Sequence, residues 1–219
     1  MRYPTPLHDA TEANNLERVL ELIGLGHDPN GLNEDEVTPL MLLCGMRTGN
    51  PLIAEMLIMA GADPNTFNPN AGQTALHTAV RSENTPLVIE LLKYSVDIHF
   101  YDADGRRIFT TACEIGDRDV VSAFIHKGAN VNEATDGGYT PLMATASFDR
   151  PWIAELLLAA GAAINAQNAL ENTALHVAHY KGRQNMQDLL LEHGADPDMR
   201  NMVGLRAADC YEEQGRRRR

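Results

Sequence analysis

Short apolar stretches recur along the chain in pairs, with a turn inside each pair and a glycine after it. In residues 140–165, Thr140-Pro141 opens one apolar run, and a second run over 153–160 ends at Gly161. Thr is a good helix N-cap, Pro suits the first helical position, and Gly accepts the left-handed conformation that ends many helices. The pattern predicts two short helices per unit, which bury their apolar faces only when neighbouring units stack.

The residue that opens each first helix recurs at a nearly constant interval. This opening slot is held by Thr5, Thr38, Thr74, Arg107, Thr140, Thr173 and Arg206, in steps of 33, 36, 33, 33, 33 and 33. The glycine that ends the second helix is Gly26, Gly61, Gly128, Gly161 or Gly194, and Ser95 replaces it once. The 36-residue step contains two extra residues around 47–50 and one in the loop 67–72. We expect both insertions in surface loops.

The residues after the opening slot carry a resemblance. They read Pro-Leu-His at 6–8, Pro-Leu-Met at 39–41 and 141–143, and Ala-Leu-His at 75–77 and 174–176. With the period of about 33, this resembles the ankyrin repeat, whose signature is T-P-L-H-x-A. The resemblance spans Thr5 to Gly215 and implies an all-α fold class, an ankyrin-repeat solenoid of stacked helix-turn-helix units with projecting β-hairpin loops.

The same alignment predicts the domain organisation. We expect a single domain over residues 1–215, with six repeats and a C-terminal half-repeat, followed by a basic tail at 216–219. The fourth unit opens with Arg106-Arg107-Ile108-Phe109 in place of Thr-Pro, which predicts a less regular helix start there.

Composition narrows the class of partner. The apolar fraction of 44% is that of a folded protein, and the net charge of −12 argues against nucleic acid and anionic membranes as partners. Weak, salt-sensitive nucleic-acid contact through Arg216–Arg219 is the alternative. Three cysteines without a CxxC spacing indicate buried thiols in a reducing compartment. Nothing resembling a signal peptide and no apolar run of about 20 residues is found. These features predict a cytoplasmic protein.

The sequence offers no chemistry for catalysis. His8, His77 and His176 occupy one slot of different units, so stacking would hold them about 10 Å or more apart, too far to share a metal. The resemblance implies that these histidines tie neighbouring loops by hydrogen bonds. Phosphate-binding loops and nucleophile elbows are missing. We therefore expect no enzymatic activity, no metal and no cofactor.

Two asparagines have a second interpretation. Asn132 and Asn165 occupy a slot similar to the one that an asparaginyl hydroxylase modifies in eukaryotic ankyrin proteins. The alternative is an asparagine that stabilises its loop. Modification would make this chain a substrate and not a catalyst.

Ankyrin repeats bind partners mostly through the concave face, which loop tips and the exposed sides of the first helices form. Carried over to this chain, the resemblance predicts partner contacts at apolar, aromatic and arginine residues on this face: Met46, Arg81, Arg106, Ile115, Tyr139, Phe148 and Tyr180. The alternative for each is packing between repeats. Phe148 in particular could fold over its helix end, with Trp152 covering it.

The resulting function is a monomeric, non-enzymatic adaptor or inhibitor that binds another protein. The acidic charge adds the option of an immunity-type inhibitor that neutralises a basic partner, and Glu34-Asp35-Glu36 is either a solvated loop tip or a contact for that partner. The alternative function is a secreted ankyrin-repeat effector that acts on host proteins.

Overall fold

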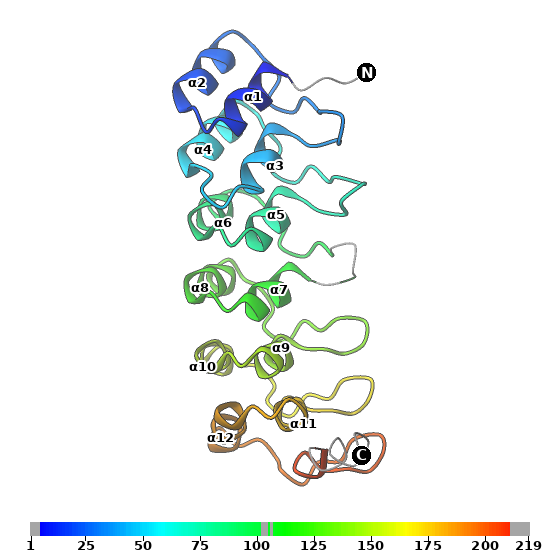
Figure 1. The fold of residues 1–219 in the computed structure, drawn as a ribbon. Coiled ribbons are helices and arrows are strands. Elements are labelled where there is room, and N and C mark those ends of the chain that lie inside the picture. The colour runs from blue at the N-terminus through cyan, green and yellow to red at the C-terminus, as the bar shows by residue number, and fades with distance from the viewer. Residues whose placement is uncertain (1–4, 102–104, 106, 211–219) are drawn as a thin grey trace. The chain divides into compact units, whose positions relative to one another are not determined.

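The computed structural model describes residues 5–101, 105 and 107–210; residues 1–4, 102–104, 106 and 211–219 lie outside this description. The described residues form twelve α-helices (Figure 1). They are α1 (Pro6–Glu12), α2 (Leu16–Gly24), α3 (Pro39–Cys44), α4 (Pro51–Met59), α5 (Ala75–Arg81), α6 (Thr85–Leu92), α7 (Ile108–Ile115), α8 (Arg118–His126), α9 (Pro141–Phe148), α10 (Pro151–Ala159), α11 (Ala174–Tyr180) and α12 (Gln184–Glu192). The predicted all-α class is confirmed.

The chain divides into two compact units, residues 1–108 and 109–219. In the first unit the first helices pack in the order α1, α3, α5, and the second helices in the order α2, α4, α6 (Figure 1). In the second unit α9 packs against α11, and α10 packs against α8 and α12. Within each repeat, α1 packs against α2, α3 against α4, α5 against α6, α9 against α10 and α11 against α12.

The opening slot sets the start of each first helix. Helices α3 and α9 begin directly after Thr38 and Thr140, whose hydroxyls each accept a 3.2 Å hydrogen bond from the amide three residues on. Helix α7 begins at Ile108 in the same alignment, after Arg107. The Arg107 guanidinium donates to the His99 carbonyl oxygen and the Tyr101 hydroxyl, both at 2.6 Å, so this side chain secures the preceding loop.

Two buried positions per repeat build the core. The leucine two residues after the opening slot is at most 1% exposed, as Leu7, Leu40, Leu76, Leu142 and Leu175. The second position, on the inner side of the second helix, is held by Leu22, Leu57, Leu91, Phe124, Leu157 and Leu190, which are equally buried. Burying such a side chain contributes about 1.5–3 kcal/mol, so the stacked core accounts for the order of helices too short to stand alone.

The loops between repeats turn back on themselves. Within the described residues they contain isolated antiparallel bridges at Asn68–Gln73, Tyr101–Arg107 and Arg200–Arg206, and no longer strand. Asparagine side chains connect successive loops. Asn132, for example, donates to the Gly161 carbonyl oxygen at 3.1 Å and accepts from the Ala163 amide at 2.7 Å. Asn165 likewise accepts from the Asp196 amide at 2.9 Å, which agrees with the loop-stabilising interpretation of these asparagines.

Candidate partner-binding surface

In the first unit, two of the residues predicted to contact a partner are described. Arg81 is exposed at the last position of α5, whereas Met46 is half-buried in the turn after α3. Arg106 lies outside the described residues. Arg81 is thus the more accessible of the two side chains.

In the second unit, Ile115 and Tyr139 are less accessible than an anchor residue would need to be. Ile115 ends α7 and is half-buried. Tyr139 is also half-buried. Its hydroxyl donates a 3.2 Å hydrogen bond to the Met143 carbonyl oxygen in the first turn of α9, and this bond holds the side chain against the helix. Its ring therefore lies along the start of the helix that it precedes.

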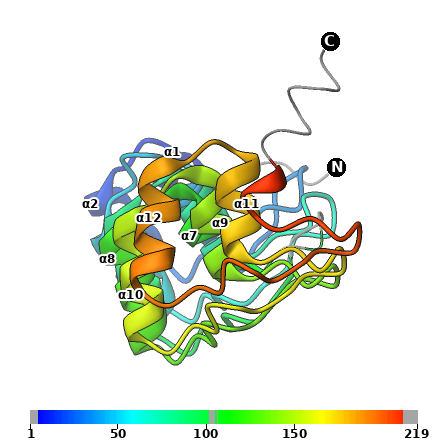
Figure 2. The ribbon, with the colours of Figure 1, turned by 90° about the horizontal axis from the view of Figure 1, so that it is seen from below.

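Phe148 and Tyr180 combine exposure with adjacent supporting helices. Phe148 is the last residue of α9 and Tyr180 the last of α11, and these helices pack against each other. Their side chains are 47% and 52% exposed. Figure 2 shows α9 and α11 between the second helices α10 and α12 and the loops of this unit. The two aromatic residues thus lie at the C-terminal ends of their helices, where each first helix turns to the second helix of its repeat.

The turn after Phe148 decides whether this ring is covered. Asp149 adopts φ +57°, the left-handed conformation that glycine more often supplies at this place. Trp152, in the first turn of α10, is 68% exposed. Because Phe148 is itself 47% exposed, Trp152 does not bury that ring.

The loop tips of the second unit add apolar residues that the sequence interpretation missed. Leu170, Met202 and Val203 are all exposed. Leu170 and Val203 are equivalent positions of successive loops, and the Met202 amide donates a 3.0 Å hydrogen bond to the Leu170 carbonyl oxygen. In the sequence, these residues could have been recognised as apolar residues at loop tips, where polar residues are usual.

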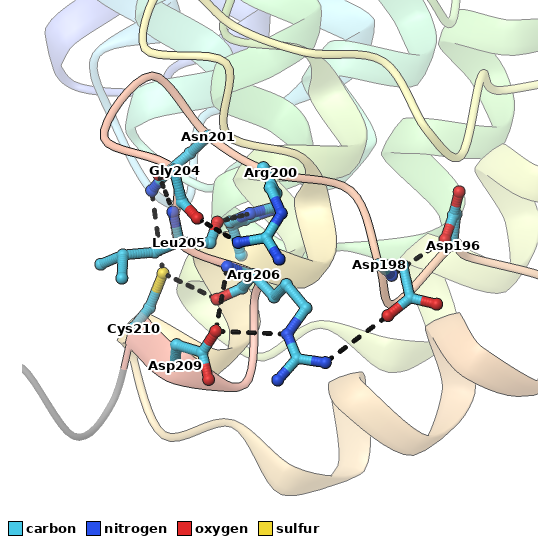
Figure 3. A network of polar contacts seen from close by, with 10 residues as sticks. Asp196, Asp198, Arg200, Asn201, Gly204, Leu205, Arg206, Asp209 and Cys210 are labelled. Carbon is cyan, nitrogen blue, oxygen red and sulfur yellow. Dashed lines mark hydrogen bonds and ion pairs between the residues drawn. The ribbon is translucent and has the colours of Figure 1, made fainter.

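A polar network holds the last of these loops in place (Figure 3). The Asn201 side-chain oxygen accepts from the amides of Val203 and Leu205 at 3.2 and 3.0 Å, and Arg200 donates to the Gly204 carbonyl oxygen at 2.6 Å. The loop that presents Met202 and Val203 is therefore ordered by its own side chains.

Arg206, which takes the threonine slot of the seventh unit, completes this network. Its guanidinium lies 3.3 Å from the Asp209 carboxylate and 3.6 Å from that of Asp198 (Figure 3). Asp209 also accepts from the Arg206 amide, so it caps the turn as histidine does in other repeats. Hydrogen bonds from Arg206 hold the pKa of Asp209 below its usual range.

Two of the three slot histidines, His8 and His176, pair with the opening threonine of their own repeat and with the next loop. His8 Nδ1 lies 2.9 Å from the Thr5 hydroxyl, and its Nε2 lies 2.8 Å from the Val37 carbonyl oxygen of the next loop. His176 joins Thr173 and the Leu205 carbonyl oxygen in the same way, at 2.9 and 3.1 Å. Burial lowers the pKa of His176, which favours the neutral ring that this pairing requires.

Within the described residues, the carboxylates, histidines and cysteines form no metal cluster, and the thiols are buried. The described residues contain no cluster of three or more His, Cys, Asp or Glu side chains placed to bind a metal ion. Cys44, Cys113 and Cys210 are buried free thiols, and burial raises the pKa of Cys44 and Cys113. No helix in the described part of the chain has the length and apolarity that a bilayer crossing requires. The basic tail, Arg216–Arg219, lies outside the described residues.

Comparison with known proteins agrees with this geometry. A family model described as ankyrin repeats (3 copies) matches residues 7–102, 82–168 and 112–201. The B-cell lymphoma 3 protein homolog of Mus musculus is 31% identical over 207 residues, which cover 90% of this chain and 45% of that protein. A putative palmitoyltransferase of Danio rerio, ZDHHC13, is 29% identical over 206 residues, which cover 93% of this chain and 32% of that protein. The chain thus spans less than half the length of these relatives.

Solved structures show the same fold. The ankyrin repeat domain of Bcl-3 superposes with a TM-score of 0.84 at 26% identity, covering 97% of this chain and 100% of that one. The human ASB11 ankyrin repeat domain gives 0.82 at 25% identity, covering 94% and 91%. A chain from the complex of the predatory endopeptidase Bd0816 of Bdellovibrio bacteriovorus with the immunity protein Bd3460 gives 0.75 at 27% identity, covering 87% and 99%.

Proposed function

The chain belongs to the ankyrin repeat family, whose fold serves as a protein-interaction scaffold. We therefore propose that it is a non-enzymatic adaptor or inhibitor that binds a partner protein. The binding face is formed by first helices and loop tips, and we call it the first-helix face. In the second unit it comprises Phe148, Tyr180, Leu170, Met202 and Val203.

The observation that carries this proposal is the exposure of Phe148 and Tyr180 on adjacent helices. Both aromatic side chains leave about half of their surface exposed, and this apolar surface is available to a partner. Central aromatic residues of an interface each contribute about 2 kcal/mol or more to binding. The Lys181 ammonium lies 5.9 Å from the Tyr180 ring centre, so this part of the face also carries a positive charge.

Within this function, an immunity-type inhibitor of a basic partner is the finer proposal. It is supported by the net charge of −12 and by the similarity to a chain of the endopeptidase–immunity protein complex. Association with a basic partner would be accelerated by electrostatic attraction and would slow as salt rises. An effector secreted into another cell remains an untested prediction.

We also propose that the protein works as a monomer in the cytoplasm. Three buried free thiols suit a reducing compartment. Sedimentation velocity at several concentrations measures the oligomeric state, and a second species that grows with concentration would contradict this part of the proposal.

Affinity capture from the native source, followed by mass spectrometry, tests the binding function. The full chain is the bait, with F148A/Y180A as the disrupting variant and W152A as the matched control on a second helix. We expect a protein retained by the parent and by W152A and lost with F148A/Y180A. Equal retention by all three baits would contradict the assigned face.

A further inference from the structure

The second helices of the first unit carry exposed apolar side chains that the first-helix face does not use. Leu52 and Met59 of α4 are 52% and 72% exposed, and Leu20 of α2 is also exposed. Leu52, Glu55 and Met59 recur at i, i+3 and i+7, so they lie along one side of α4. Glu17, Leu20 and Glu21, at i, i+3 and i+4, lie along one side of α2. We call these six residues the outer face of α2 and α4.

The outer face is continuous across two helices. Helix α2 packs against α4, and α4 packs against α6, along one side of the first unit (Figure 1). In the repeat alignment Glu17 is equivalent to Leu52, and Leu20 is equivalent to Glu55. Apolar and acidic positions therefore alternate from one helix to the next. Ile89 of α6, equivalent to Leu20, extends the apolar part and is exposed as well.

The repeat itself does not require apolar residues at these positions. In the second unit, α8 and α12 carry exposed polar residues at these positions: Asp119 and His126 on α8, and Asn185, Asp188 and Glu192 on α12. Helix α10 carries the exposed Trp152 at the position equivalent to Leu52. Exposed leucine and methionine beside a carboxylate therefore distinguish α4 from these helices, and exposed apolar patches mark interaction sites.

The charge of α2 and α4 indicates which class of partner would bind the outer face. The first repeat carries one arginine among the described residues, Arg18, which pairs with Glu21 at 2.6 Å. Against it, α2 itself carries Glu17 and Glu21, and α4 carries Glu55 as its one charged residue. An exposed pair of this kind contributes little, so the surface remains acidic. A second copy of the chain or an anionic membrane would be repelled, whereas a cationic segment would be attracted.

We propose that the outer face of α2 and α4 binds a basic amphipathic helix of a partner protein. Apolar residues of that helix at i, i+3 or i+4, and i+7 contact Leu20, Leu52 and Met59, and flanking Lys or Arg residues approach Glu17 and Glu55. This site lies on the second helices and is separate from the first-helix face, so either site can fail without the other.

A defined peptide probe tests the proposal on the full chain. The probe is a fluorescent 18-residue peptide of Leu and Lys with Leu at helical spacing, and its control is a scrambled peptide of the same composition. Fluorescence anisotropy should show at least about tenfold tighter binding of the periodic peptide, because only that peptide buries an apolar stripe. Equal affinity of the two peptides would overturn the proposal, because charge alone would then explain binding.

Variants locate the site. L52S/M59S should weaken binding of the periodic peptide by at least about tenfold. L191S, a substitution at a 43% exposed leucine of α12 in the second unit, should leave it unchanged. E17Q/E55Q should weaken binding and reduce its dependence on salt. Unchanged affinity in L52S/M59S, or equal weakening in L191S, would overturn the assignment.

Binding of a second copy of the chain and binding of a membrane are measured in parallel. Sedimentation velocity detects self-association, and flotation with vesicles of phosphatidylcholine and phosphatidylglycerol detects membrane binding. We expect neither with the parent protein. Either activity, if abolished by L52S/M59S, would assign the outer face to that occupant and would overturn the proposal.

Discussion

The side-chain amide of Asn84 donates a 2.8 Å hydrogen bond to the backbone carbonyl oxygen of Met46. The same nitrogen lies 3.3 Å from the Gly49 carbonyl oxygen, while the side-chain oxygen caps α6 by accepting from the Leu87 amide at 3.2 Å. Asn84 is only 2% exposed. One buried residue therefore caps its own helix and fixes the longer turn between α3 and α4, where the two extra residues of the second repeat lie.

Replacing Asn84 by Ala should lower the free energy of unfolding by about 2–3 kcal/mol, because a helix cap is lost and buried carbonyl groups lose a donor. Asn15→Ala is the matched control, since Asn15 caps α2 at an exposed position through a single bond to the Arg18 amide. That variant should cost about 1 kcal/mol. Urea denaturation measures both, and equal losses would show that the contact with the turn contributes nothing.

Gly138 and Gly161 both have positive φ, +74° and +92°, but their surroundings differ. A Cβ at Gly138 would lie 2.9 Å from the Asn168 Cα of the next loop, whereas a Cβ at Gly161 would meet no atom within 4 Å. Gly161→Ala should cost about 1 kcal/mol from backbone strain alone. Gly138→Ala should cost clearly more, because two loops must move apart. Thermal unfolding of both variants checks this order, and the reverse order would contradict the loop packing.

The titration of His176 should make stability depend on pH. Its folded-state pKa is lowered by burial, against an unfolded value of about 6.5, so the unfolded chain binds more protons as the pH falls below that value. Stability is complete above about pH 6.5 and declines as the pH drops through the folded pKa. His179, whose pKa is also lowered by burial, adds to the decline.

His176→Gln separates capping from titration. Gln can still bond the Thr173 amide at the helix start but does not titrate. Urea midpoints between pH 7 and 5.5 should fall less steeply for this variant than for the parent. Parallel slopes would mean that His176 contributes nothing to the pH dependence.

Leu157→Ala tests the core alignment. Leu157 is fully buried on α10, and its truncation should cost about 2–5 kcal/mol. Leu191→Ala, at an exposed position of α12, should cost much less. Because repeats contact only their neighbours, a lost core contact should also broaden the unfolding transition. If calorimetry found Leu157→Ala and the parent melting alike, the assigned helix alignment would be wrong.

The sequence was sufficient to predict the fold because the opening threonine, the buried leucines and the terminal glycines recur with one period. Each of these residues acts locally or on the neighbouring repeat, so a pattern in the chain translates directly into contacts. It was also enough to predict the pairing of His8 and His176 with neighbouring loops, through the family resemblance.

Side-chain exposure was harder to predict. Tyr139 occupies a position expected to be exposed, yet its hydroxyl finds the Met143 carbonyl oxygen and its ring is half-buried. Leu170 and Val203 are exposed because hydrogen bonds fix the loop backbone around them, and repeat periodicity does not encode those bonds. The exposed stripe on α4 is not evident from the sequence, since all but one of the residues of that helix are apolar and periodicity alone does not say which side faces out.

The central claim is that the first-helix face of the second unit binds a protein partner, and titration calorimetry with the captured partner tests it most directly. The account predicts that F148A/Y180A weakens binding by at least about a hundredfold, since two hot-spot aromatics contribute about 2 kcal/mol each. W152A should change the affinity by no more than about twofold, because an exposed side chain outside an interface contributes little to binding. An unchanged affinity in F148A/Y180A, with the helical circular dichroism of the parent retained, would contradict the account.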